Sequence, residues 1–231
     1  MKKILLLLFG TLALLINAQN KLNEELKKEL DEIMSVDQGY RMLFTSETTP
    51  EQKEKTLKDL NINQEEFKKK GWQMVAEHDS INLHKIENII SKYGYPGKTL
   101  VGEPTNKAAW YVIQHSTKIG KYLPLIKEAG KNKEIPFTLV AMMEDRYLMD
   151  ENKEQIYGTQ GRGEMTKDKD GKQVFVSFVW PVKDLKNVDK IRKEAGFDST
   201  VEENAKRMFG KDFKYEPYTL KQVLELRNKN K

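Results

Sequence analysis

Apolar residues recur at every third or fourth position through much of this chain, which is the spacing of an amphipathic α-helix. The period is clear in residues 22–34 and again in residues 83–93. It changes at Gln155–Gln160 and Val174–Trp180, two short runs rich in residues that favour strands. We therefore predict a mainly α fold of the α+β class. It has an antiparallel helical core and one β-hairpin in the C-terminal half, whose strands are joined by a long loop at residues 161–172.

Capping residues mark the expected helix boundaries in the first half of the chain. Asn63 has the form of an N-terminal cap for one helix. Asp79 or Ser80 can cap a second, separate helix, which Gly94 is expected to end because glycine accepts the left-handed conformation found just past many helices.

The first residues have the composition of a cleaved signal peptide. Lys2 and Lys3 form a basic start, residues 4–16 are apolar, and Ala18 supplies a small residue before the cut. The alternative is a transmembrane anchor, but this apolar run has 13 residues, whereas a spanning helix needs about 20. We expect cleavage after residue 18 and an exported protein, periplasmic or secreted, without a membrane anchor. The remaining chain is predicted to consist of charged N-terminal helices at 19–60 and a single globular domain at 61–231.

The composition excludes several classes of protein. The 231 residues include no cysteine, so a lipid-anchored lipoprotein, disulfide bonds and thiol chemistry are excluded. Without Lys2 and Lys3 the chain carries 38 basic and 35 acidic residues, which is a nearly balanced charge. Lysines alternate with glutamates, and no basic stripe interleaved with aromatic residues is present, so we expect no nucleic-acid partner.

His115 is the first candidate site residue. It lies four residues after Tyr111 and seven after Ala108, so a continuous helix would place it on their inward face. A partly buried imidazole can act as a general acid or base, while the alternative is a core histidine satisfied by a carbonyl or a carboxylate. Gln114 is a candidate ligand-binding residue. It lies about 100° away around the same helix, so the two side chains are not expected to point squarely into one pocket.

Asp145 and Arg146 form a second candidate pair, close to the end of a predicted buried helix. The arginine can bind an anionic ligand while the aspartate orients His115 or accepts a proton. The alternative is a structural ion pair that ties the helix to the hairpin.

The run Tyr157-Gly158-Thr159-Gln160 is the third candidate. Glycine inside a strand usually marks a bulge or the close approach of another backbone or a ligand. Tyr157 and Gln160 would then supply neutral hydrogen-bonding groups to a ligand. The alternative is a strand interior in which the glycine makes room for a neighbouring Trp or Tyr side chain.

We predict no metal site and no cofactor. The spacing of the histidines does not match a zinc site, since His78 and His84 are six residues apart and fall on different faces of a helix. Residues 168–171 resemble part of a calcium loop, but Thr166 and Ser177 occupy its first and last ligand positions. The sequence also has no phosphate loop and no Gly-x-Ser-x-Gly motif.

Several short motifs occur in an order that resembles a known bacterial family. They are Asp79–Asn82, Tyr93–Gly97, Val101–Gly102, Ala108–Trp110, Gln114–His115, Leu123–Leu125, Asp145–Arg146, Gln155–Gln160, Pro181, Asp184 and Val188–Gly196. Over about residues 60–200 the chain resembles the uncharacterised domain-of-unknown-function family 6624. The resemblance implies that the three candidate motifs belong together, and it brings no known reaction or ligand. Met143 and Glu144 stand where the family pattern has alanine and leucine, which leaves open which carboxylate faces His115.

Three functions are consistent with these residues. The first is an exported protein that binds a small polar or anionic ligand, or one derived from the cell envelope, in a pocket between the elements that carry His115, Asp145 and Tyr157. Arg146 would bind the ligand and His115, Tyr157 and Gln160 would orient it, with Gln114 as a further ligand-binding residue. The second is an envelope-associated hydrolase with His115 as general acid or base and Asp145 as its partner. The third is a structural or interaction protein in which the same residues form a buried polar network.

Overall fold

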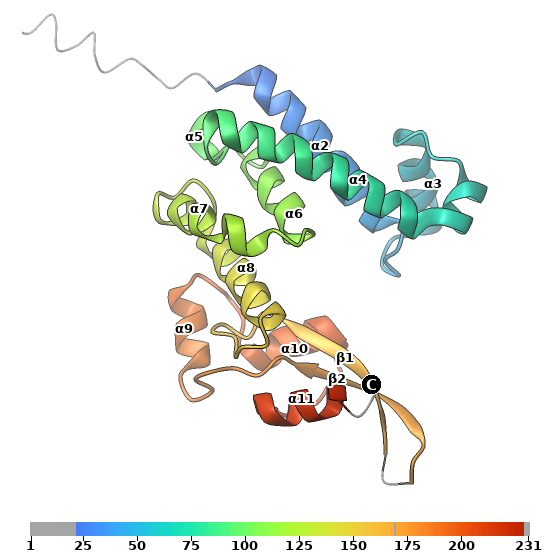
Figure 1. Ribbon diagram of the computed structural model, residues 1–231, viewed down its shortest axis with the longest axis vertical. Coiled ribbons are helices and arrows are strands. Elements are labelled where there is room, and N and C mark those ends of the chain that lie inside the picture. Colours follow the sequence, from blue (N-terminus) through green and yellow to red (C-terminus); the bar gives the residue numbers. More distant parts are fainter. Residues whose placement is uncertain (1–21, 169, 229–231) are drawn as a thin grey trace, which may run out of the picture. The chain divides into compact units, whose positions relative to one another are not determined.

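The computed structural model describes residues 22–168 and 170–228 of the chain (Figure 1). The predicted signal peptide lies outside these residues. The described chain is mainly helical and has one antiparallel hairpin in its C-terminal half, which confirms the predicted fold class. It forms two compact units, the first ending at Val112 and the second beginning at Ile113.

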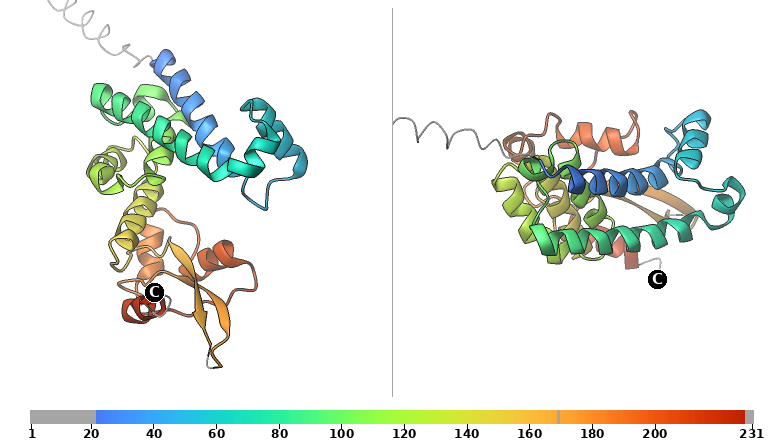
Figure 2. Two further views of the ribbon diagram at one scale, coloured as in Figure 1. Left: turned by 45° about the vertical axis from the view of Figure 1, so that its right-hand side comes forward. Right: turned by 90° about the horizontal axis from the view of Figure 1, so that it is seen from above.

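The first unit is built around two long helices, α2 (Glu24–Met42) and α4 (Gln64–Tyr93), which pack side by side (Figure 2). Leu26, Leu30 and Ile33 form the buried stripe of α2. The short helix α3 (Pro50–Asp59) also packs against α2, although none of its own residues is buried. Helices α2, α3 and α4 all belong to this compact unit.

Helix α4 is a single helix of 30 residues, so the prediction of two separate helices in this region was wrong. The carboxylate of Asp79 does not cap a helix. It instead accepts hydrogen bonds from Arg41 of α2, at 2.8 and 2.9 Å, so its capping tendency is overridden by an interhelical ion pair. The predicted ends are confirmed: Asn63 caps the helix by accepting the Glu66 N–H at 3.0 Å, and Gly94 ends it with φ of 73°.

Short helical segments complete the first unit: α5 (Lys98–Val101), the 3₁₀ helix η1 (Thr105–Lys107) and the first part of α6 (Ala108–Gln114). The Thr105 hydroxyl donates to Asp31 of α2 at 2.6 Å. The Tyr95 hydroxyl donates to the carbonyl of Asn106 at 2.8 Å, and its burial raises the pKa of Tyr95. These two bonds tie η1 to α2 and to the turn that follows α4.

The second unit begins with an antiparallel pair of helices, α7 (Ile119–Lys131) and α8 (Phe137–Asp150). The pair is close where the chain turns, because a Cβ at Gly130 would stand only 2.4 Å from the Val140 side chain. Farther along, Lys127 and Glu144 form an ion pair at 2.6 Å. Helix α8 carries Asp145 and Arg146 in its second half.

The hairpin follows, with β1 (Gly161–Lys167) pairing antiparallel to β2 (Gln173–Val179). The register runs from Gly161 opposite Val179 to Lys167 opposite Gln173, so the turn spans only residues 168–172. The prediction of a first strand at residues 155–160 and a long loop at 161–172 was therefore wrong. Residues 155–160 form a loop that pairs with the chain after β2 only at its two ends: Gln155 forms an isolated parallel bridge with Val182, and the carbonyl of Gln160 accepts the N–H of Trp180 at 2.9 Å.

Three helices pack around the hairpin: α9 (Val188–Glu194), α10 (Val201–Phe209) and α11 (Leu220–Asn228). Two apolar clusters form the core here. The residues of the first are Val179, Val182, Val188, Val201 and Ala205, and those of the second are Phe178, Trp180 and Val223. The loop at residues 155–160 lies next to the first cluster, because a Cβ at Gly158 would contact both Val201 and Val182.

Candidate functional site

The loop of residues 155–160 is held by the carboxylate of Asp145, which projects from α8. This carboxylate accepts the backbone N–H groups of Ile156 at 2.7 Å, Tyr157 at 3.1 Å and Thr159 at 3.0 Å. It also accepts the Thr159 hydroxyl at 2.9 Å. The Asp145 side chain is 0% exposed, and its hydrogen bonds all go to this loop. One carboxylate therefore replaces the strand ladder that these backbone groups would otherwise need.

The charge of Asp145 is subject to two opposing effects. Burial raises the pKa of Asp145 because it disfavours the ionised form. The three backbone N–H groups and the Thr159 hydroxyl oppose this rise, since they donate to the ionised carboxylate. Its bonding capacity is consumed by structure, so Asp145 is not positioned to fix the tautomer of a histidine.

Gln155 closes the two ends of the loop. Its side-chain amide is fully buried and donates to the carbonyl of Gln160 at 3.0 Å, while its amide oxygen accepts the backbone N–H of Gln160 at 2.9 Å. The same amide nitrogen donates to the carbonyl of Trp180. The Gln155 side chain thus makes to Gln160 the two hydrogen bonds that a neighbouring strand would make. These bonds keep the two ends of the loop together.

Two more buried side chains bind the loop carbonyls. Arg192 of α9 is 1% exposed and donates to the carbonyl of Tyr157 at 2.8 Å, and Asn204 of α10 donates to that of Gly158 at 3.0 Å. Arg192 also donates to Ser199 and lies over the Phe197 ring, 4.7 Å from its centre. Burial lowers the pKa of Arg192. The hydrogen-bond acceptors of this guanidinium are two backbone carbonyls and the Ser199 hydroxyl, all of which are neutral.

Gly158 is required at its position for two reasons. Its φ of 66° lies in the left-handed region, which glycine adopts without steric cost. A Cβ would also stand 2.5 Å from the Val201 side chain of α10. The glycine therefore admits a close neighbour, as one prediction had it, but the neighbour is a valine and not a Trp or Tyr.

The six predicted residues fall into two groups. Asp145 joins the loop that contains Tyr157 and Gln160, whereas Arg146, the next residue of α8, donates to the carbonyl of Gln114 at 3.2 Å. His115 follows Gln114 and is half-buried in the turn after α6, so it is not on the helix that the sequence predicted. Adjacent positions of one helix thus serve two different segments of the chain.

In the first group, the side chain of Gln160 is buried and donates to the carbonyl of Met142 at 3.3 Å and to the Thr159 hydroxyl at 3.1 Å. Tyr157 is half-buried, with its ring centre 6.3 Å from that of Phe197. Burial raises the pKa of Tyr157, and the nearby carboxylates of Glu144 and Asp145 add to this rise.

In the second group, Arg146 is a half-buried cation. Among the described residues, no carboxylate lies within 4.0 Å of its guanidinium, and its hydrogen bond goes to a neutral carbonyl. Burial lowers the pKa of Arg146, while Asp150, at longer range, opposes this shift. A guanidinium has five N–H donors, so most of them remain available to an acceptor.

Gln155, Arg192 and Asn204 were not predicted as members of this site. A signal for Arg192 is present in the sequence: it follows Val188 by four residues and precedes Ala195 by three, which puts it on the apolar side of a short amphipathic helix. An arginine at such a position needs buried acceptors. Gln155 and Asn204 give no comparable signal, because their partners are backbone groups that become neighbours only in the folded chain.

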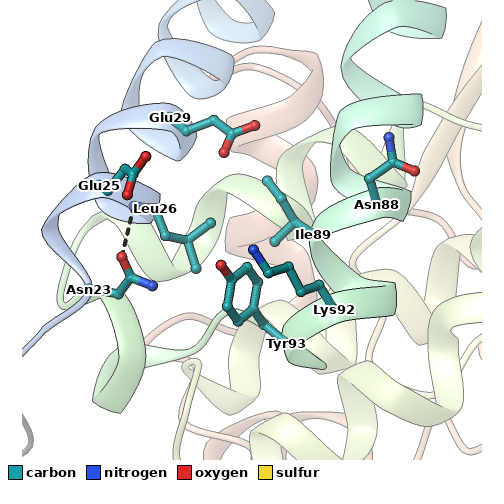
Figure 3. Close-up of a pocket in the computed structure, with 8 residues that line it drawn as sticks. All are labelled: Asn23, Glu25, Leu26, Glu29, Asn88, Ile89, Lys92 and Tyr93. Atoms are coloured by element: carbon teal, nitrogen blue, oxygen red, sulfur yellow. Dashed lines mark hydrogen bonds between the residues drawn. The ribbon is translucent and has the colours of Figure 1, made fainter.

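The first unit has a hollow of its own between the start of α2 and the end of α4 (Figure 3). Its volume is about 240 Å³, and Lys92 lies across it over the Tyr93 ring, 4.8 Å from the ring centre. The lining residues are Asn23, Glu25, Leu26, Glu29, Asn88, Ile89, Lys92 and Tyr93. None of the six predicted site residues lines this hollow.

Comparison with known proteins identifies a family for this chain. Neither the curated proteins nor the solved structures contain a match to it. No helix of the described residues is long and apolar enough to cross a membrane. A family model described as a family of unknown function matches residues 68–215, which cover α8, the loop, the hairpin and Arg192. This match confirms the resemblance found in the sequence, and the chain belongs to this family, DUF6624.

Proposed function

We propose that this is an exported protein that binds a small anionic ligand through Arg146. The observation that carries the proposal is the half-buried Arg146 guanidinium, which lacks a carboxylate partner within 4.0 Å among the described residues. Burying an unpaired charge is costly. Arg192 also lacks a carboxylate partner among the described residues, but it donates to two carbonyls and a hydroxyl, whereas Arg146 donates to one carbonyl. Export rests on the basic and apolar residues that open the sequence.

The chemistry of the guanidinium sets the class of ligand. Its planar donors match the two oxygens of a carboxylate or a phosphate, and the bond to the Gln114 carbonyl uses one N–H group of the five. His115 is the next residue after Gln114 and supplies a second polar group on the same turn. In this proposal Asp145, Gln155 and Arg192 hold the second unit together, and they do not contact the ligand.

The buried loop network favours a second candidate, a structural or interaction protein in which these polar residues serve only the fold. A hydrolase with an Asp145–His115 pair is the weakest of the three, because the hydrogen bonds of Asp145 all go to residues 156–159.

Ligand-induced stabilisation of the chain from residue 19 tests the proposal. Phosphate, sulfate, succinate and citrate would each be titrated while the melting temperature is measured. A ligand at 100 times its Kd stabilises by about 2.7 kcal/mol. We expect at least one anion to raise the melting temperature of the natural chain and to leave that of Arg146→Gln unchanged.

Lys131→Gln is the matched control, since it removes the same charge from an exposed position of α7. It should retain the full response. Equal responses in Arg146→Gln and the natural chain, or no response to any anion, would leave the structural role as the better explanation. Fractionation of cells that express the full chain tests export separately: the mature protein should leave the cytoplasm and begin at residue 19.

A further inference from the structure

The first unit exposes one large aromatic side chain in an ordered arrangement. Trp72, in the first half of α4, is 71% exposed, which exceeds every other large hydrophobic side chain of the described residues. The other two tryptophans, Trp110 and Trp180, are 2% and 0% exposed. A single exposed apolar side chain needs no explanation, but Trp72 stacks on Phe44, which is itself 37% exposed, so the two rings form a joined apolar patch of the kind that marks interaction sites.

The Trp72 ring is held flat by Phe44, which follows the end of α2. The two rings are stacked, with centres 4.0 Å apart and planes inclined by 22°. Phe44 is itself fixed by Phe67, at 5.1 Å between centres, and by Gly71, where a Cβ would stand 3.0 Å from the Phe44 ring. One face of the indole is therefore covered by Phe44, and the 71% exposure of the residue places the other face in solvent.

The charges beside the indole include one cation, Lys69, that has no carboxylate partner among the described residues. Lys68 and Lys69 precede Trp72 by four and three residues, which places them on the same side of α4. Lys68 pairs with Glu65 at 2.8 Å. Within residues 22–168 and 170–228, no carboxylate lies within 4.0 Å of the Lys69 ammonium. A cationic ligand would be repelled here, and an anionic one attracted.

We infer that the exposed face of Trp72 binds a sugar ring that carries an acid group, such as a uronate in a polysaccharide. The C–H groups on one face of a pyranose ring stack on an indole, whose negative face attracts their partial positive charge. The acid group of the same ring would then pair with Lys69. This site lies in the first unit and uses no residue of the proposed anion site at Arg146, so the two proposals stand or fall separately.

A lipid surface is the competing ligand, because tryptophan and lysine also occur together at membrane interfaces. The geometry disfavours it. An indole that inserts into a bilayer surrounds both of its faces with lipid, but Phe44 already covers one face of Trp72, whereas a ring-shaped ligand needs only the open face.

Tryptophan fluorescence tests this inference directly, because Trp72 is the exposed one of the three tryptophans and reports on its own surroundings. The probes are polygalacturonate, alginate and hyaluronate, with methyl-esterified polygalacturonate as the matched uncharged chain. We expect at least one acidic chain to change the emission with saturation, and the esterified chain to bind at least tenfold more weakly.

Four variants and one control locate the effect. Trp72→Ala should abolish binding measured by calorimetry, and Phe44→Ala and Lys69→Gln should each weaken it about tenfold. Phe175→Ala is the control, since this side chain is 66% exposed on the hairpin, and it should bind as the natural chain does. Trp72→Phe, which keeps a ring, should retain part of the affinity and would show that any loss in Trp72→Ala does not come from unfolding.

Three results would overturn the inference. The first is an unchanged emission with all acidic chains at millimolar concentrations of sugar. The second is an equal affinity for the esterified chain, which removes the role of the acid group. The third is an emission shift with phosphatidylglycerol vesicles in place of the glycans, which assigns the surface to lipid.

Discussion

The carboxylate of Asp145 accepts the backbone N–H of Tyr157 and so fastens α8 to the loop that precedes the hairpin. Neutralising this carboxylate should therefore unfold the second unit more easily. We expect Asp145→Asn to lower the free energy of unfolding by about 2–4 kcal/mol, because its amide cannot accept all the donors that the loop presents. Urea denaturation followed by circular dichroism measures the change.

Asp150→Asn is the control for that measurement, since Asp150 is exposed at the end of the same helix. It should change the stability by less than about 0.5 kcal/mol. A similar small change in Asp145→Asn would mean that the loop does not depend on the carboxylate.

Gly158 and Gly171 form a matched pair for a test of close packing. Both have positive φ, at 66° and 78°, but a Cβ at Gly158 would meet Val201 at 2.5 Å, whereas Gly171 has nothing within 4 Å. Gly171→Ala should cost about 1 kcal/mol of stability, the price of the backbone conformation alone. Gly158→Ala should cost about 2–4 kcal/mol, because the steric conflict adds to it. Equal losses in thermal unfolding would contradict the contact with Val201.

Replacing Arg192 by lysine, which keeps the charge, is expected to lower the stability of the fold. Lysine cannot reach the Tyr157 carbonyl, the Ser199 carbonyl and the Ser199 hydroxyl at once, as the guanidinium does. Arg192→Lys should lose about 1–3 kcal/mol in urea denaturation. Arg162→Lys, at an exposed position of β1, should stay within about 0.5 kcal/mol, and the prediction fails if the two variants behave alike.

The hydroxyl of the half-buried Tyr95 makes the first unit sensitive to alkali. Burial raises the pKa of Tyr95 above its ordinary value of 10.0, so the folded state keeps its proton where the unfolded state begins to lose it. The stabilisation is complete below pH 10 and is lost as the pH rises further, by about 1.4 kcal/mol per pH unit. Tyr95→Phe should show a smaller slope of unfolding free energy between pH 9.5 and 11, roughly the range in which a free phenol titrates. An unchanged slope would place the alkaline sensitivity elsewhere.

Capping residues and apolar periodicity predicted most of the helices, because the contacts that they report lie within one or two turns of the same helix. Asn63 and Gly94 mark the ends of α4 through contacts within one turn. The period of residues 174–180 identified β2 almost to the residue. The break proposed at Asp79 failed because the partner of its carboxylate is Arg41, which is 38 positions away in the chain.

The loop at residues 155–160 could not be distinguished from a strand by its composition. Its backbone N–H groups are satisfied by the side chain of Asp145, which lies up to 14 residues earlier, and its carbonyls by Arg192 and Asn204, which lie 35 to 46 residues later. A run of strand-forming residues indicates an extended backbone whose N–H and C=O groups need hydrogen-bond partners. Whether a strand or side chains supply these partners depends on residues far away in the sequence.

Asp145 and Arg146 occupy successive positions of α8 and contact different segments, the loop at 156–159 and the end of α6. Successive helical positions differ by about 100° in direction, so both contacts depend on the same angular setting of the helix. One residue inserted or deleted between Phe137 and Asp145 would turn both side chains away from their partners together. Variation in chain length during evolution should therefore be absorbed by the turns at residues 132–136 and 168–172, while the first half of α8 keeps its length.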